Sequence, residues 1–145
     1  MFIGEYKHNL DVKGRLAIPA KFRQVLTHGA VVTKGLDDCL FLYPKEEWDK
    51  LAAKVANLSL YKANHRAFAR FMLAPAMSLE IDAQGRVVLP EYLRKYAGIE
   101  KKVIIAGLYD HLEIWDETKW EKYKQGVDTK STDIAETLND NGLLS

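Results

Sequence analysis

One short motif occurs twice in this 145-residue chain, and the repetition constrains the fold more than any other feature. The motif Asp-Val-Lys-Gly-Arg at residues 11–15 returns as Asp-Ala-Gln-Gly-Arg at residues 82–86. Each copy runs into three apolar residues and a proline, Pro19 in the first copy and Pro90 in the second. The Asp, Gly, Arg and Pro positions of the two copies are all 71 residues apart. We therefore interpret the chain as two copies of one unit, each built around the same turn.

Both copies predict the same order of elements, with apolar spacing typical of short strands and short amphipathic helices. In the first copy we expect strands at residues 6–10, 16–18, 31–33 and 40–43, and helices at 19–26 and 45–55. In the second copy we expect strands at 87–89, 103–105 and 112–115, and helices at 90–97 and 117–123. A half of about 55 residues has little interior of its own. The sequence therefore predicts an α+β protein, mainly β, whose halves pair about a pseudo-twofold axis around a shared core.

Two segments lie outside the copies. Residues 56–76 form a connecting segment with a helical pattern in Phe68, Phe71 and Met72. This helix either covers the end of the barrel or packs on a neighbouring subunit. Residues 124–130 look like a hinge, followed by a short marginal helix at 132–138. The expected division is a first module at 1–55, the connecting segment at 56–76, a second module at 77–123, and a tail at 124–145 that is mobile or docked on a partner.

Several classes of protein and site are disfavoured by the residues that are present. No apolar run approaches the roughly 20 residues of a membrane span, and the first residues lack the pattern of a signal peptide. Cys39 is the single cysteine and lies in an apolar run, so we expect a buried thiol, and the four histidines show no metal spacing. Neither a nucleotide-binding glycine loop nor a nucleophile beside a base is evident. We expect a cytoplasmic protein that is not an enzyme and has no cofactor or metal.

The charge is unevenly distributed. The net charge is only +1, but residues 7–34 carry six lysines and arginines against one aspartate. Residues 128–145 carry one lysine against four acidic residues. The basic excess therefore surrounds the first copy of the motif.

The arginine of the motif needs an explanation beyond turn formation. A turn of this kind uses Gly14 for its left-handed backbone and Asp11 to accept backbone N–H groups. Lys13 and Arg15 are two residues apart, so in an extended segment they lie on one face. Two such cations suit phosphate binding, and the arginine fork also matches guanine O6 and N7 in a major groove. The alternative is an Arg15–Asp11 ion pair that only stabilises the turn.

Five stretches together resemble the MraZ family of bacterial transcriptional regulators. They are the two motifs, Phe-Ile-Gly-Glu-Tyr at 2–6, Pro-Ala-Lys-Phe-Arg at 19–23 and Leu-Glu-Ile-Trp at 112–115. The resemblance covers about residues 1–123. It implies two AbrB-like swapped-hairpin halves in one double-split β-barrel with short peripheral helices, and subunits that form a homo-oligomeric ring. It also implies sequence-specific binding of double-stranded DNA in the nucleoid, at short direct repeats upstream of the division and cell-wall cluster that includes the gene itself. The leading hypothesis is repression of that operon.

The resemblance assigns roles to residues of both motifs. The expected DNA-binding residues are Lys7, Lys13, Gly14, Arg15, Gln84, Gly85 and Arg86, and the turn-structuring residues are Asp11 and Asp82. Gln84 is uncharged where the first copy has Lys13, so we expect the first copy to make the stronger contact. The competing hypothesis is a ring-forming interaction scaffold whose basic turns stabilise the assembly without specific DNA binding.

Overall fold

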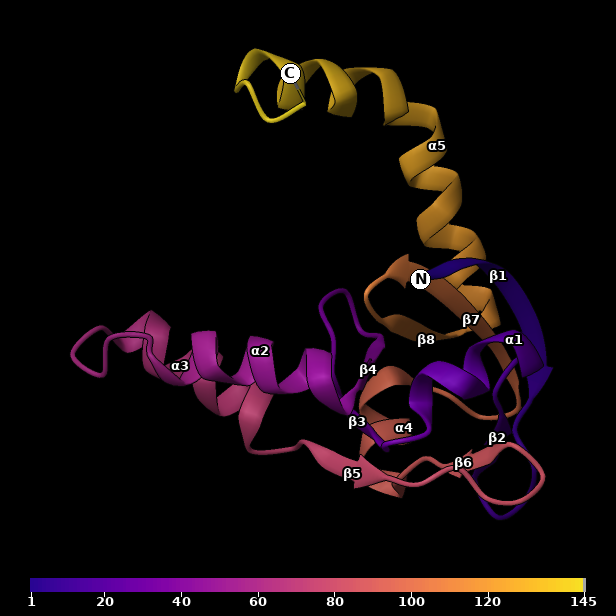
Figure 1. Cartoon of the computed structure of the whole chain (residues 1–145). Coiled ribbons are helices and arrows are strands. Elements are labelled where there is room, and N and C mark those ends of the chain that lie inside the picture. The colour runs from indigo at the N-terminus through magenta and orange to yellow at the C-terminus, as the bar shows by residue number, and fades with distance from the viewer. Residues whose placement is uncertain (145) are drawn as a thin grey trace.

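A six-stranded antiparallel sheet and a two-stranded antiparallel ribbon form the body of the protein (Figure 1); the computed structural model describes residues 1–144. The first copy supplies β1 (Phe2–Asn9), β2 (Arg15–Ala17), β3 (Ala30–Lys34) and β4 (Leu40–Pro44). The second copy supplies β5 (Met77–Leu79), β6 (Arg86–Val88), β7 (Lys102–Tyr109) and β8 (Leu112–Asp116). The prediction of a mixed α+β protein that is mainly sheet is confirmed.

The strand order shows how the two copies combine. The sheet runs β1-β7-β8-β4-β3-β5, and β2 pairs with β6 in the ribbon. The first strand of each copy, β1 or β5, pairs with a hairpin strand of the other copy, and β4 meets β8 in the middle. If each strand is replaced by its counterpart in the other copy, the same strand order results, read from the opposite edge of the sheet. Neither copy can therefore complete the sheet or the ribbon alone.

One hydrophobic core is shared by both copies. Leu16 and Val87 point inward from the ribbon, while Leu40 and Leu112 point inward from the two central strands, and all four are buried. Burying one such side chain contributes about 1.5–3 kcal/mol relative to leaving it exposed. Cys39 is also buried, as predicted, and burial raises the pKa of its thiol.

Short helices follow the two ribbon strands. Pro19 precedes α1 (Ala20–Arg23), which continues into a 3-10 turn at Gln24–Leu26, and Pro90 precedes α4 (Glu91–Ala97). Proline suits this place because its fixed φ is close to helical and the first turn needs no N–H from it. The helix predicted at 19–26 is thus present as an α-helical turn and a 3-10 turn.

The helices α2 (Lys45–Ala56) and α3 (Ala63–Leu73) form an arm that projects sideways from the sheet in Figure 1. The base of the arm is fixed, since the hydroxyl of Thr33 donates to the carbonyl oxygen of Met72 at 2.7 Å and Phe71 packs edge-on against Tyr96. The tip is solvent-exposed, and Tyr61 there is 97% accessible. None of the helices in residues 1–144 is long and apolar enough to cross a membrane.

The predicted hinge at 124–130 is wrong, because α5 runs without a break over Glu117–Asp140. The segment predicted as a separate short helix at 132–138 is part of α5. Gly126 lies inside the helix, and the hydroxyl of Thr129 donates to its carbonyl oxygen at 2.9 Å. Such side-chain bonds bend helices without ending them. Figure 1 shows α5 leaving the sheet and then bending.

We expect Gly126→Ala to stabilise the protein by about 1 kcal/mol, because alanine is favoured over glycine in a helix interior and a Cβ at this position meets no atom within 4 Å. Helical circular dichroism and the midpoint of thermal unfolding measure the effect. Gly142→Ala is the matched control, since Gly142 follows the helix with φ +72° and should give no gain. An unchanged midpoint in Gly126→Ala would contradict the expected gain from alanine in the helix interior.

Candidate nucleic-acid interface

The first motif forms a tight turn between β1 and β2. Gly14 adopts φ +78°, which an L side chain rarely takes, and its N–H donates to the carbonyl oxygen of Asp11 at 3.0 Å. The N–H of Asp11 donates to the carbonyl oxygen of Arg15 at 3.1 Å. The Asp11 carboxylate then caps the turn, since Oδ1 accepts the N–H groups of Lys13 and Arg15, each at 2.9 Å.

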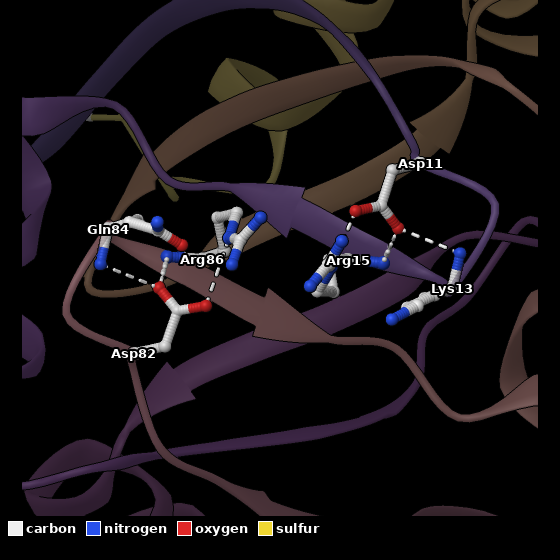
Figure 2. Close-up of polar contacts among 6 residues, drawn as sticks. All are labelled: Asp11, Lys13, Arg15, Asp82, Gln84 and Arg86. Carbon is white, nitrogen blue, oxygen red and sulfur yellow. Dashed lines mark hydrogen bonds and ion pairs between the residues drawn. The ribbon is translucent and has the colours of Figure 1, made fainter.

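The second motif repeats this geometry between β5 and β6. Gly85 adopts φ +79°, and Asp82 Oδ1 accepts the N–H groups of Gln84 and Arg86, each at 2.9 Å. Figure 2 shows the two turns at opposite ends of the ribbon. Because lysine in one copy and glutamine in the other contribute only a backbone N–H to the turn, the turn does not require either side chain.

The Asp–Arg ion pair considered as an alternative role for the arginine is present in both turns. Arg15 Nε lies 2.5 Å from Asp11 Oδ2, and Arg86 Nε lies 2.9 Å from Asp82 Oδ2. The backbone N–H groups of the two arginines and these ion pairs hold the pKa of each aspartate below its usual value. Only Nε is used, so within residues 1–144 the terminal nitrogens of both guanidinium groups make no hydrogen bond. The arginines can therefore stabilise the turns and still present a charged edge.

Main-chain hydrogen bonds join each turn to the other copy. The N–H of Leu89 donates to the carbonyl oxygen of Gly14 at 2.9 Å, and the N–H of Ile18 donates to the carbonyl oxygen of Gly85 at 2.9 Å. The turn of each copy is thus held by the strand end of the other. Distortion of one turn would therefore also displace the strand end of the other copy.

A second pair of arginines, absent from the predicted site, supports these turns. Arg23 donates through Nε to the carbonyl oxygen of Ile18 at 2.9 Å, and its guanidinium covers Gly85 so closely that a Cβ there would lie 2.2 Å from Cζ. Arg94 occupies the equivalent place over Gly14, where a Cβ would lie 3.1 Å from Cζ. Their 71-residue spacing in the sequence was the available signal, since it matches the spacing of the motif itself.

The ribbon separates an inner apolar face from an outer basic face. Leu16 pairs with Val87, and both are buried. Arg15 pairs with Val88, and Arg86 pairs with Ala17, so these four side chains share the outer face. The two arginines are diagonal neighbours, about 7–8 Å apart in an antiparallel pair. An antiparallel ribbon of two strands has the dimensions to enter a major groove of B-DNA.

The other predicted residues lie at different distances from this face. Lys13 and Gln84 are exposed in the two turns, at the ends of the ribbon. Lys7 is not on the ribbon: it is exposed on β1, opposite Ile104 of β7, and shares a hollow with Lys102 and Glu117. The structure therefore brings together both motifs, with Lys7 on a neighbouring strand.

We expect the two aspartates to make folding stability sensitive to acid. Their pKa values are depressed in the folded state, so their contribution is present above the ordinary carboxyl pKa of 3.8 and is lost as the pH falls through the folded value. Replacing both by asparagine keeps a side-chain oxygen that can accept the backbone N–H groups but removes the negative charge. Urea unfolding at about pH 6 and about pH 3 should show a smaller loss of stability in D11N/D82N than in the wild type. Equal losses would contradict a stabilising role for the ion pairs.

Comparison with known proteins places both copies in one family. The family model described as "MraZ protein, putative antitoxin-like" matches residues 1–71 and again residues 72–142. A protein named transcriptional regulator MraZ from Syntrophomonas wolfei is 48% identical over 143 residues, which is 99% of this chain and all of the relative. Relatives of the same name from a Thermoanaerobacter species and from Pediococcus pentosaceus are 49% and 46% identical, over 97% and 99% of this chain and 98% and 100% of their own lengths. The chain belongs to the MraZ family.

Proposed function

We propose that this protein is a transcriptional regulator that binds double-stranded DNA sequence-specifically through the β2–β6 ribbon. The observation that carries the proposal is the placement of Arg15 and Arg86 on the same outward face, each oriented by an aspartate through Nε alone. An arginine fork reads guanine O6 and N7, and a guanidinium held in place loses less freedom on binding than a free one. The ion pairs therefore prepare the arginines for base contact.

The turns at the ends of the ribbon supply the proposed phosphate contacts. Backbone N–H groups and cations beside a turn suit phosphate oxygens. The proposed contact residues are Lys7, Lys13, Gly14, Arg15, Gln84, Gly85 and Arg86, with Asp11 and Asp82 shaping the turns. Because Lys13 is charged and Gln84 is not, the first turn should hold DNA more strongly.

The exchange of strands between the copies supports a swapped-hairpin, double-split barrel as the description of the fold. In this proposal the modules are residues 1–55 and 77–123, joined by 56–76 and followed by a tail at 124–145. The pairing of β1 with β7 and of β5 with β3 is the exchange that such a barrel requires.

A single subunit offers few well-placed cations, and each phosphate contact adds a salt-dependent increment of affinity. We propose that subunits assemble into a ring that presents several ribbons to short direct repeats, which raises the effective concentration of each further contact. The proposed target is the DNA upstream of the division and cell-wall cluster that includes the gene, and the proposed outcome is repression in the cytoplasm, at the nucleoid. No enzymatic activity is part of the proposal.

The competing function is a ring-forming scaffold without specific DNA binding. Two observations favour it: the Asp–Arg pairs stabilise the turns without any ligand, and the arm tip exposes Leu60 and Tyr61, which suit a protein partner. The two hypotheses predict different effects of Arg15→Ala on DNA affinity and on oligomer mass.

We expect Arg15→Ala to weaken binding to the upstream DNA by about tenfold or more, because one bidentate base contact is worth about 1–3 kcal/mol. Arg15→Lys should lose nearly as much specificity while keeping much of the nonspecific affinity, since lysine retains the charge but not the fork. Gel-shift titration of both variants on the upstream DNA and on unrelated DNA measures the two effects. Footprinting of the wild type locates the bound repeats.

The scaffold hypothesis gives the opposite pattern. Under it, Arg15→Ala would change the oligomer mass in light scattering, and the wild type would show no preference for the upstream DNA. Lys50→Ala, on α2 and far along the chain from both motifs, is the matched control for loss of one positive charge. Wild-type DNA affinity in Arg15→Ala, with an intact fold by thermal unfolding, would rule out the proposed contact.

A further inference from the structure

The two ends of the ribbon differ in charge although their backbones match. His8 of β1 pairs with Val103, and Leu79 of β5 pairs with Ala30, while His8 and Leu79 occupy the same place in the two copies. Val103 and Ala30 are therefore structural equivalents. Continuing this alignment along the sequence sets Lys101 and Lys102 against His28 and Gly29, although only Lys102 is paired with the neighbouring strand, because β5 ends at Leu79.

This correspondence shows a cluster of lysines at one end only. The first-end lysines are Lys7, Lys13, Lys101 and Lys102, and the matching residues at the second end are Ser78, Gln84, His28 and Gly29. The second end also carries Glu80, where the first has Asn9. One end is thus strongly basic, and the other has no lysine at these positions.

Lys101 and Lys102 are held beside the first turn by the main chain. The N–H of Leu10 donates to the carbonyl oxygen of Lys101 at 2.7 Å, which places Lys101 one residue from Asp11. Lys102 lies opposite Asn9, the last residue of β1. Both side chains are exposed, and neither makes an ion pair within the described part of the chain. The opposing charges nearby are Glu117, which lines the same hollow as Lys102, and Glu100, which precedes Lys101 in the chain.

The second end carries acidic groups beside its arginines. A hollow beside the second turn is lined by Arg23, His28, Glu80 and Asp82, among others. His28 Nδ1 lies 2.7 Å from Glu46 Oε1, so its ring is already engaged by a carboxylate. Arg23 donates to a backbone carbonyl and covers Gly85. The cations at this end are thus offset by carboxylates, since Arg23 lies beside Glu80 and Arg86 is paired with Asp82, and it should attract phosphates less than the first end does.

We propose that Lys101 and Lys102, together with Lys13, bind DNA phosphates at the first end of the ribbon, so that the two ends of the bound ribbon make unequal phosphate contacts. The proposal rests on the proposed function and adds two contact residues and a polarity to it. When the ribbon enters a major groove, its two ends face the two sugar-phosphate walls. The pseudo-twofold relation places Arg15 and Arg86 in equivalent positions. Turning the ribbon end for end in the groove therefore presents almost the same base-reading face.

The flanking lysines make the two ends of the ribbon unequal instead. Both walls of the groove carry phosphates, so the lysines add affinity at whichever wall they face, and the base sequence decides which wall that is. On each bound repeat, the phosphates at the first end of the ribbon should therefore contribute more affinity than those at the second end.

The first test is the salt dependence of binding by the double variant K101A/K102A. Each phosphate contact contributes about 0.9 to the slope of log affinity against log salt, so we expect the slope to fall by about two. The probes are a duplex from the DNA upstream of the gene and an unrelated duplex of equal length. Affinity should fall on both by a similar factor, which leaves the preference for the upstream duplex unchanged.

The control variant K50A/K54A removes two exposed lysines from α2 and should keep the wild-type slope. A wild-type slope in K101A/K102A, with wild-type thermal unfolding and oligomer mass, would overturn the proposed contacts. If Arg15→Ala still weakens binding in that case, the proposed function stands without them. If instead Arg15→Ala binds normally and K101A/K102A does not, the lysines bind DNA but the ribbon does not read it.

The second test asks whether the phosphate contacts are stronger on one side of the groove. Ethylation of single phosphates in a duplex with one protected repeat should interfere with wild-type binding more strongly on one side of the groove than on the other. The stronger side should lose its effect in K101A/K102A. His28→Lys places a lysine at the second end and should make the interference more equal on both sides. Equal interference on both sides in the wild type would overturn the polarity.

Discussion

The structure depends on main-chain hydrogen bonds that join the turn of each copy to the ribbon strand of the other. The carbonyl oxygen of each turn glycine accepts an N–H from just beyond the ribbon strand of the other copy. The carbonyl can point that way because Gly14 and Gly85 adopt positive φ angles. With three-residue strands, the ribbon would be marginal without these extra bonds at both ends. The two copies are therefore joined at the proposed DNA-binding surface.

The arginines near the ribbon divide into two kinds. Arg23 and Arg94 turn inward, donate to backbone carbonyls and cover the turn glycines, where they replace the side chain that glycine lacks. Arg15 and Arg86 lie on the outer face and are held only through Nε. Both kinds keep the same spacing in the sequence. The first kind fixes the turns, which in turn fix the backbone from which the second kind projects.

Much of the architecture follows from the sequence, because the repeated motif sets two turns and the apolar patterns around it are local. The helix beginning at Lys45 and the hairpin strands came from residues close together in the chain. The pairing of β1 with β7 did not, since it joins residues about a hundred positions apart and no local pattern specifies such a partner. The prediction of a hinge was wrong for a different reason. Gly126 lowers the helix propensity of the segment, but the flanking residues and the Asp116 cap outweigh one glycine.

The candidate site was predictable in its polar residues but not in its geometry. Both motifs could be found by spacing, whereas the shared outer face of Arg15 and Arg86 requires the register of the ribbon. Lys101 and Lys102 are 86 or more residues beyond Arg15 in the chain and become its neighbours only through β1 and β7. Their equivalence to His28 and Gly29 is likewise invisible until the strands are paired.

The symmetry of the core and the asymmetry of the surface charges have separate physical origins. The core is shared, so a change in the size of Leu40 or Leu112 would disturb both copies at once, at a typical cost of about 2–5 kcal/mol for truncation. Exposed residues such as Lys101 are under no such restraint, because surface substitutions usually alter stability by less than about 0.5 kcal/mol. The fold therefore does not require four lysines at one end of the ribbon and none at the matching positions of the other. Under the proposed function, phosphate contacts that are stronger at one end of the ribbon account for their grouping there.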